Sequence, residues 1–411
     1  MAELKVRSYF AGLTRDTVLL AFASFFSDIS TEMIYPILPV FLTQVLHASG
    51  SALGLVEGAA QATQNVMQGF SGWFSDRLQR RRSLALAGSF LSAVVKPLPG
   101  LAAAWPGVLG ARFLDRLGAG LRSAPRDALV AASVEEANRG RAFGLEGFGD
   151  NLGAFLGPLL AVLLVISLHL AIRWIFYLAV LPGLLAVLMI SLVQERRGPA
   201  AAKIKTDVNL RDFPRPYWRY LLVTAIFGLG NSSNSFLILQ TKDAGASFEA
   251  TILIYAGFNL MAALISYPAG SLSDRWGRRN LLVLAFLIFF LAYLGFARAK
   301  SAVLLAILFF VYGLFQGIFR SVGKAFASDF VPGRLRASAV GWYSTTVGPL
   351  GLAASLIAGV LWDRVGHAAV FYYGAAFAAL GSIAAVALLP ASPEKTNRTG
   401  AASLLRSAPE A

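Results

Sequence analysis

GWFSDRLQRR, residues 72–81, is written again with small changes as GSLSDRWGRR at residues 270–279. Both copies read Gly-x-x-x-Asp-Arg-x-x-Arg-Arg, and they start 198 positions apart in a chain of 411 residues. A repeat at about half the chain length indicates that one structural unit was built twice. The fold is therefore predicted to consist of two related halves, each with one copy of this decapeptide.

The composition places the chain in a membrane. Hydrophobic residues make up 56% and charged residues only 14%, against about 45–50% and about 25% in soluble domains. Gly, with 39 residues, is also more frequent in membrane helices than in soluble ones. The absence of cysteine excludes disulfides, thiolate metal sites and a cysteine nucleophile.

Apolar runs of the length that a membrane helix needs, about 20 residues, recur along the whole chain. The sequence predicts twelve such segments, near residues 18–43, 52–74, 83–104, 106–129, 142–167, 172–193, 218–240, 250–272, 281–299, 302–328, 338–362 and 368–389. The first run is too long for the core of a signal peptide and lacks a small-residue cleavage site after it. We therefore expect it to remain as the first membrane helix.

The net charge of +14 follows the topology and does not indicate nucleic-acid binding. With the N-terminus inside, most Lys and Arg outside the helices fall on the cytoplasmic side. The outer loops then hold only Arg173, Lys242, Arg298, Lys300 and Arg364. Such an asymmetry sets orientation, so both termini are predicted to be cytoplasmic, in the inner or plasma membrane of a prokaryote.

A basic, proline-containing stretch at residues 194–217 separates the two sets of six segments. Each decapeptide follows the second helix of its set and lies on the cytoplasmic side, so the halves are expected to be parallel repeats. Such transporters bind substrate near the bilayer midplane and move one half against the other. The predicted divisions are an N-terminal six-helix bundle (1–193), a linker (194–217), a C-terminal six-helix bundle (218–390) and a disordered tail (391–411).

The decapeptide resembles the signature motif of the major facilitator superfamily, Gly-x-x-x-Asp-Arg-x-Gly-Arg-Arg. Residues 270–279 match every fixed position, and residues 72–81 match except that Gln79 replaces the second Gly. The resemblance implies an all-α membrane protein with twelve transmembrane helices in two pseudo-symmetric six-helix halves. It also implies a transporter and not an enzyme, in keeping with the lack of a soluble segment long enough for a catalytic domain.

In this family the charge cluster around the motif is thought to latch one conformation. The glycines allow close helix approach, and acids at helix ends can pair with the arginines. The latch candidates are Gly72, Asp76, Arg77, Arg80, Asp127, Gly270, Asp274, Arg275, Arg278 and Asp329. The alternative is topological, with arginines that merely mark the cytoplasmic face.

Helix 1 contains two acids in FASFFSDISTEMIYPILPVFL, residues 22–42. Asp28 and Glu32 are four positions apart and share a helix face, with Tyr35 nearby. Acids inside a membrane helix are expensive and are functional candidates by default. Each carboxylate disfavours ionisation of the other, as proton carriage requires. The structural alternative is permanent pairing with an arginine.

Helix 5 repeats this spacing with Glu146 and Asp150, and helix 4 supplies Arg112 and Arg116. Downstream in helix 5, the run Gly153-x-x-x-Gly157-Pro158 resembles the antiporter motif of drug–proton exchangers, without its final Gly-Gly. Plain helix packing is the alternative, since GxxxG is common where helices touch. Exporters of the superfamily often carry an arginine in helix 4 that takes part in proton transfer. Asp28, Glu32, Glu146, Asp150, Arg112 and Arg116 are the predicted proton-coupling residues.

The superfamily resemblance implies that helices 1, 4, 7 and 10 line the central cavity. Acids gather in the first half of the chain, and amides and cations in the second. The predicted substrate-cavity residues are Tyr35, Glu57, Gln61, Asn231, Asn234, Gln316, Arg320 and Lys324.

These features favour a proton-coupled exporter that exchanges a small molecule for protons, acting as a monomer in the bilayer. Two alternatives stay open: a proton symporter that imports an organic anion, with Arg116, Arg320 and Lys324 as counter-ions, and a non-transporting receptor or scaffold. No cofactor is expected, because the chain lacks a phosphate-binding Gly-x-x-x-x-Gly-Lys loop. No metal is expected either, since His47, His169 and His367 are scattered in the sequence.

Overall fold

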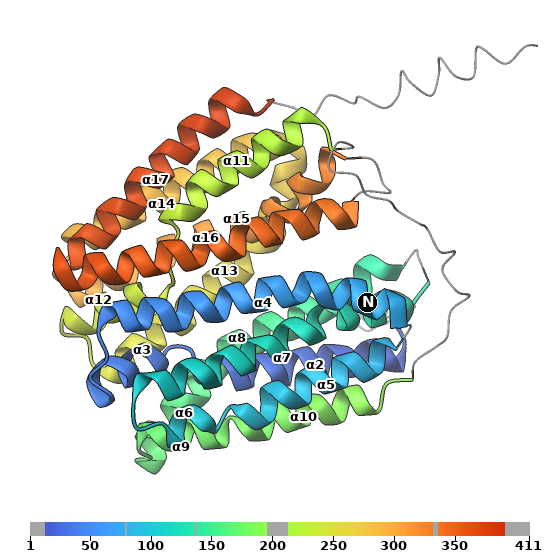
Figure 1. Cartoon of the computed structure of the whole chain (residues 1–411), viewed down its shortest axis with the longest axis horizontal. Coiled ribbons are helices and arrows are strands. Elements are labelled where there is room, and N and C mark those ends of the chain that lie inside the picture. The colour runs from blue at the N-terminus through green and yellow to red at the C-terminus, as the bar shows by residue number, and fades with distance from the viewer. Residues whose placement is uncertain (1–12, 79, 136–137, 195–212, 332–335, 391–411) are drawn as a thin grey trace, which may run out of the picture.

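The computed structural model describes residues 13–78, 80–135, 138–194, 213–331 and 336–390, and within these ranges it contains helices and no strand. The helices before the linker are α2 (Arg15–Glu32), α3 (Leu38–Val40), the π-helical turn η1 (Phe41–Val45), α4 (Gly50–Leu78), α5 (Arg81–Val95), α6 (Leu98–Leu101), α7 (Trp105–Ala132), α8 (Arg139–Leu168), α9 (Ile172–Leu178) and α10 (Val180–Ser191) (Figure 1). Those after it are α11 (Arg215–Gly230), α12 (Ser235–Asp243), α13 (Phe248–Trp276), α14 (Arg278–Arg298), α15 (Ala302–Asp329), α16 (Arg336–Arg364) and α17 (His367–Leu388).

Each of the twelve predicted segments is helical over most of its length. Within the described ranges, nine helices are long and apolar enough to cross a membrane. The three remaining segments are those of α2, α4 and α7, which carry Asp28, Glu57 and Arg112 among other charges. In α4 and α7 two of these charges pair with each other, Glu57 with Arg112.

Two of the segments are broken near the middle of the bundle. The first is divided into α2, α3 and η1 around Pro36 and Pro39, since proline lacks the N–H that a continuing helix uses. The seventh is divided into α11 and α12, with residues 231–234 between them. The backbone groups freed at such breaks are tolerated in a membrane only where they are buried in protein or line a cavity.

The packing of the helices repeats in the two sets. In residues 13–194, α2 packs on α8 and α10, and α7 packs on α4 and α5. In residues 213–390, α11 packs on α17, and α15 packs on α13 and α14. The two sets meet mainly where α4 lies along α16 and α8 lies along α13 (Figure 1).

The bundle has two ends that differ in how the halves meet. We call the linker end the one where α10 finishes and α11 begins, and the far end the one that holds η1 and the loop after α12. At the far end, one apolar cluster joins Phe41 and Leu53 of the first half to Phe236 and Ala358 of the second. The cluster at the linker end of the first half, around Leu20 and Leu129, contains residues of that half alone.

Glycines on α4 bring the halves into close contact. A Cβ atom at Gly54 would lie 2.1 Å from the carbonyl oxygen of Ser355 on α16, and one at Gly58 would lie 2.9 Å from Leu352. Small residues four positions apart let two membrane helices approach to backbone contact. The spacing Gly50–Gly54–Gly58 thus defines the face of α4 that meets α16.

Candidate functional site

A cavity of about 110 Å³ lies between the two halves. Asp28, Glu32 and Asp150 contribute three carboxyl groups to its wall from α2 and α8. The facing wall comes from the second half and is lined by Asn234, Tyr255, Phe258, Asn259, Ala262, Ser266, Gln316 and Arg320.

Glycines of α8 hold the acidic wall in place. A Cβ atom at Gly153 would lie 2.4 Å from the carbonyl oxygen of Phe25 and 3.0 Å from Cβ of Asp28. One at Gly157 would lie 3.0 Å from Cβ of Glu32. Because no side chain separates the helices here, α2 rests on the backbone of α8, and this close approach brings Asp28 and Glu32 to the same cavity wall as Asp150.

Glu32 is bonded across the boundary between the halves. The hydroxyl of Tyr255 on α13 donates to Oε2 of Glu32 at 2.9 Å. The Tyr255 ring stacks on Tyr35, with centroids 5.4 Å apart and an interplanar angle of 23°. Asn259 adds a bond from its Nδ2 to the carbonyl of Ala154, at 3.1 Å. One turn of α13 therefore contacts both helices of the acidic wall.

Arg126 on α7 is a hub for the carboxylates nearer the linker end. Its guanidinium lies 3.1 Å from Oε1 of Glu146 and 3.6 Å from Oδ1 of Asp150. The same group lies 3.1 Å from Asp127 and donates to Oγ of Ser24 at 3.0 Å. Ser24 in turn donates to Glu146 at 2.7 Å. Glu146 and Asp150 therefore share one cation, but only Asp150 lines the cavity.

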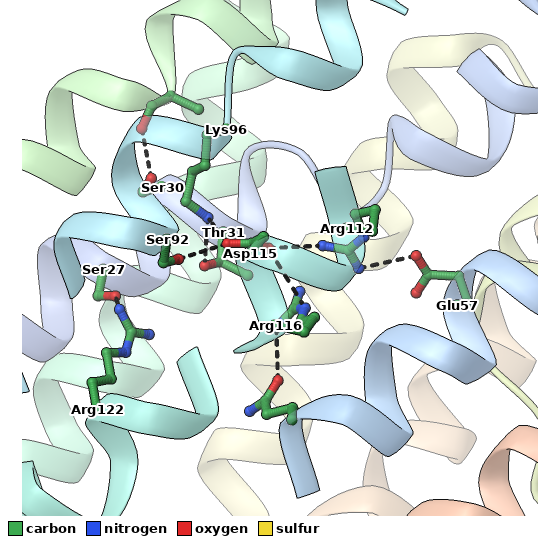
Figure 2. A network of polar contacts seen from close by, with 12 residues as sticks. Ser27, Ser30, Thr31, Glu57, Ser92, Lys96, Arg112, Asp115, Arg116 and Arg122 are labelled. Carbon is green, nitrogen blue, oxygen red and sulfur yellow. Dashed lines mark hydrogen bonds and ion pairs between the residues drawn. The ribbon is translucent and has the colours of Figure 1, made fainter. Parts of the chain in front are cut away.

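A second charge network is buried within the first half, around Asp115 of α7 (Figure 2). Asp115 lies 3.5 Å from Lys96, 3.3 Å from Arg112 and 3.7 Å from Arg116. It also accepts a hydrogen bond of 2.6 Å from Ser92. Arg112 bonds Glu57 of α4 at 2.9 Å. Each charge has a partner, which offsets the cost of burial.

Several predicted residues belong to this network or to helix contacts and not to the cavity wall. Arg112 and Arg116 both contact Asp115, and Glu57 pairs with Arg112. Arg116 also donates to Gln64 at 3.0 Å. Gln61 is exposed, and Asn231 caps the end of α11. Lys324 has a side chain outside the described part of the structure. Of the predicted cavity residues, Asn234, Gln316 and Arg320 do line the wall.

The decapeptides hold helix ends together. Gly72 approaches Ala124 of α7, with 3.5 Å to an added Cβ, and Arg278 forms an ion pair with Asp329. Arg279 donates to the carbonyl of Leu389, after α17, and Arg82, the residue that follows the first decapeptide, donates to that of Ser191, which ends α10. Cations at helix C-termini satisfy the last carbonyls.

For the other latch candidates, the structure shows fewer contacts. Asp127 pairs with Arg126, and Arg80 and Arg275 are exposed. The side chains of Asp76, Arg77 and Asp274 lie outside the described part of the structure, as do residues 195–212 of the linker and the whole tail, and of Gly270 only the backbone, within α13, is described.

The sequence does not predict Arg126, Tyr255, Asn259 or Asn151 as residues of the site. Arg126 follows Arg122 by four positions and so shares its helix face, but the spacing does not name its partners. Tyr255 and Asn259 are also four apart. That spacing of two polar residues in an apolar helix is a signal that could have indicated them.

The model of the Major Facilitator Superfamily matches residues 20–237 and, in a second match, residues 220–409. An uncharacterized MFS-type transporter of Methanocaldococcus jannaschii is 34% identical over 377 residues, which cover 90% of this chain and 94% of the relative.

More distant relatives have named roles. A probable 4-methylmuconolactone transporter of Cupriavidus pinatubonensis is 27% identical, covering 74% of both chains. The multidrug resistance protein MdtG of Salmonella arizonae is 26% identical, covering 71% of this chain and 75% of the relative. Among solved structures, a mutant of the nucleoside transporter NupG superposes with a TM-score of 0.77 at 14% identity, over 92% of this chain and 100% of that one.

Proposed function

Because this chain belongs to the major facilitator superfamily, and is therefore a multi-pass membrane transporter of small molecules, we propose that it exports its substrate in exchange for protons. The observation that carries the proposal is the placement of Asp28, Glu32 and Asp150 on one wall of a cavity between the halves. Intramembrane acids that face a cavity mark proton or ion pathways. Binding of substrate on that wall competes with protons for the same carboxylates.

The conformation supports access from the linker end. The far end is closed by the shared apolar cluster and by the close approach of α4 to α16. Asp150 and Arg320 lie on the linker side of Tyr255 along the bundle, and Arg320 is exposed. We place the linker end in the cytoplasm, from the distribution of Lys and Arg, so that substrate enters the cavity from inside the cell.

Alternating access follows from rotation of one half against the other. The moving bodies are residues 1–193 and 218–390, joined by 194–217, in a monomer of the inner membrane. To open the far end, α4 must leave α16, and Tyr255 must leave Glu32. Protonation of Glu32 weakens the latter bond, because hydrogen bonds to an ionised acceptor are about twice as strong as neutral ones. Arrival of a proton thereby favours separation of the halves.

The experiment uses respiring everted vesicles that contain the full chain and a pH-sensitive dye. Cationic, neutral and anionic compounds are added in turn, and proton release is recorded. Release that is lost in Asp28→Asn/Asp150→Asn, and kept in Glu135→Gln at an exposed carboxylate outside the cavity, supports antiport. Release that persists unchanged in the double variant contradicts the assignment of these acids.

A second candidate is a proton symporter that imports an organic anion. The exposed guanidinium of Arg320 in the cavity favours it. It predicts uptake of an aromatic acid such as benzoate into right-side-out vesicles, driven by an inward proton gradient and lost in Arg320→Gln. The three carboxyl groups on the cavity wall of the first half argue against this candidate, since they repel an anion whenever they are ionised.

A further inference from the structure

The two walls of the cavity have opposite electrical character. The first half contributes three carboxyl groups and the amide of Asn151. The second half contributes one guanidinium, Arg320, and no carboxyl group among the lining residues. The division follows the boundary between the moving halves, so any bound molecule that contacts both halves meets both charges.

Two of the charges that face the cavity, Asp28 and Arg320, do not form an ion pair with each other. Among the residues that the structure describes, Asp28 forms no ion pair and accepts no hydrogen bond, although it lines the cavity. Likewise Arg320 has no described carboxylate oxygen within 4.0 Å. Other interior charges form ion pairs, as in Arg112 with Glu57 and Arg126 with Glu146, whereas Arg122 donates to the hydroxyl of Ser27.

We propose that the transported molecule is a zwitterion, a compound with a cationic nitrogen and a separate anionic group, bound with the cation at Asp28 and the anion at Arg320. The inference rests on the proposed function of this cavity and deepens it. A molecule with only one charge can form a charge-assisted hydrogen bond with one wall only, and it leaves the charge of the other wall without a counter-ion. A zwitterion satisfies both walls at once.

The remaining lining residues can contact the uncharged part of such a molecule. Asn234, Asn259 and Gln316 supply amides that donate and accept hydrogen bonds. Tyr255 and Phe258 supply aromatic faces, against which an apolar or cationic group can pack. Since the two charged groups of the ligand bind different halves, the ligand bridges the halves and makes its binding sensitive to their separation.

The test uses matched probes that differ only in charge. One trio is phenylalanine, phenylalaninamide and N-acetylphenylalanine; a second is 6-aminohexanoate, hexylamine and hexanoate, in which the two charges are farther apart. Binding is measured as the rise in unfolding temperature of the purified full chain, since a ligand that binds only the folded state raises the free energy of unfolding with the logarithm of 1 + [L]/Kd. Transport is measured separately, as proton movement in proteoliposomes.

The expected result is that, in at least one trio, the zwitterion stabilises the protein about tenfold more effectively, by concentration, than either single-charge analogue. Arg320→Gln should bring the zwitterion to the level of the cation, and Asp28→Asn to that of the anion. Arg219→Gln, at an exposed arginine of α11 away from the cavity, should keep the wild-type order.

Two kinds of result overturn the inference. One is a single-charge probe that equals or exceeds its zwitterion in both trios; the other is the lack of stabilisation by either zwitterion. The proposed function has a separate readout. Stabilisation by a zwitterion without proton movement supports the inference and contradicts proton coupling, whereas proton movement driven by a cation alone supports antiport and contradicts the zwitterion.

Discussion

Tyr35 and Ser233 are 198 positions apart, the spacing of the two decapeptides, and their hydroxyl oxygens lie 3.4 Å from each other. Equivalent residues of two related halves can come this close only near the axis that relates the halves. Both residues lie where a membrane segment is broken, between α2 and α3 and between α11 and α12. The two breaks therefore meet at the centre of the transporter, directly beside the cavity.

The bond between Tyr255 and Glu32 should couple proton binding to the separation of the halves. Tyr255→Phe removes this bond and keeps the ring that stacks on Tyr35. A hydrogen bond to a charged group contributes about 1.5–3 kcal/mol, so substrate-driven proton movement in vesicles should fall by roughly tenfold or more while the protein still folds. Tyr372→Phe, at an exposed ring of α17, is the control, and equal activity of the two variants would refute the coupling role.

Asp363 should help to keep the far end closed. Its carboxylate on α16 accepts hydrogen bonds from the backbone N–H groups of Gly50 and Ser51, at 2.7 and 2.8 Å, and so caps the start of α4 in the other half. Loss of such a cap costs about 0.5–2 kcal/mol. Asp363→Ala should therefore increase the open population at the far end by about 2- to 30-fold, and Asp363→Asn, which keeps an acceptor, by less.

The natural lack of cysteine makes this opening measurable. Spin labels on Gln44→Cys and Val365→Cys, at the far end on opposite halves, report the distance distribution by pulsed electron resonance. Longer distances should appear in Asp363→Ala. An unchanged distribution would mean that the apolar cluster alone holds this end.

Gly153 should be intolerant of a methyl group, whereas a glycine six positions earlier in the same helix should accept one. A Cβ at Gly153 would lie 2.4 Å from a carbonyl oxygen of α2, but one at Gly147 has no atom within 4 Å. We expect Gly153→Ala to lower stability by about 1–3 kcal/mol and Gly147→Ala to leave it unchanged or raise it by about 0.5–1 kcal/mol. Thermal unfolding in detergent compares them, and similar shifts would disprove close contact between α2 and α8.

Arg112 should stabilise the folded first half. Its guanidinium and Glu57 are both buried, with side chains 4% and 5% exposed. Removal of one partner of a buried pair destabilises by about 3–5 kcal/mol, so Arg112→Gln should unfold at a markedly lower temperature. The double variant Arg112→Gln/Glu57→Gln should recover part of the loss. If instead Arg112→Gln unfolds normally and loses only proton movement, the arginine acts in coupling, as the resemblance to exporters suggested.

Much of the architecture could be predicted because it depends on local composition. Apolar runs of membrane length and a repeated decapeptide are sufficient to give the helices, and the family comparison bears out the fold. The acids of α2 and α8 could be named as candidates because charge in a membrane helix is rare. Their roles remain predictions, as does the choice between export and import.

The partners of each charge could not be predicted in the same way. Asp28 and Glu32 share a helix face by spacing alone, and so do Glu146 and Asp150, yet Asp150 lines the cavity and Glu146 lies buried against Arg126. Helical periodicity fixes which residues share a face. It leaves open how each helix is rotated about its axis and which neighbour it meets.

Composition, helical periodicity and the repeat were therefore sufficient to predict a two-fold repeated membrane bundle with acids in one half and an arginine and amides in the other. The packed helices were needed to find that Arg112, Arg116 and Glu57 pair within the first half, while Asp28, Asp150 and Arg320 face a common cavity. This arrangement of the acids follows from the contact between α2 and α8. Glycines at 153 and 157 set the separation and rotation of these helices, and that rotation selects the carboxyl groups which face the cavity.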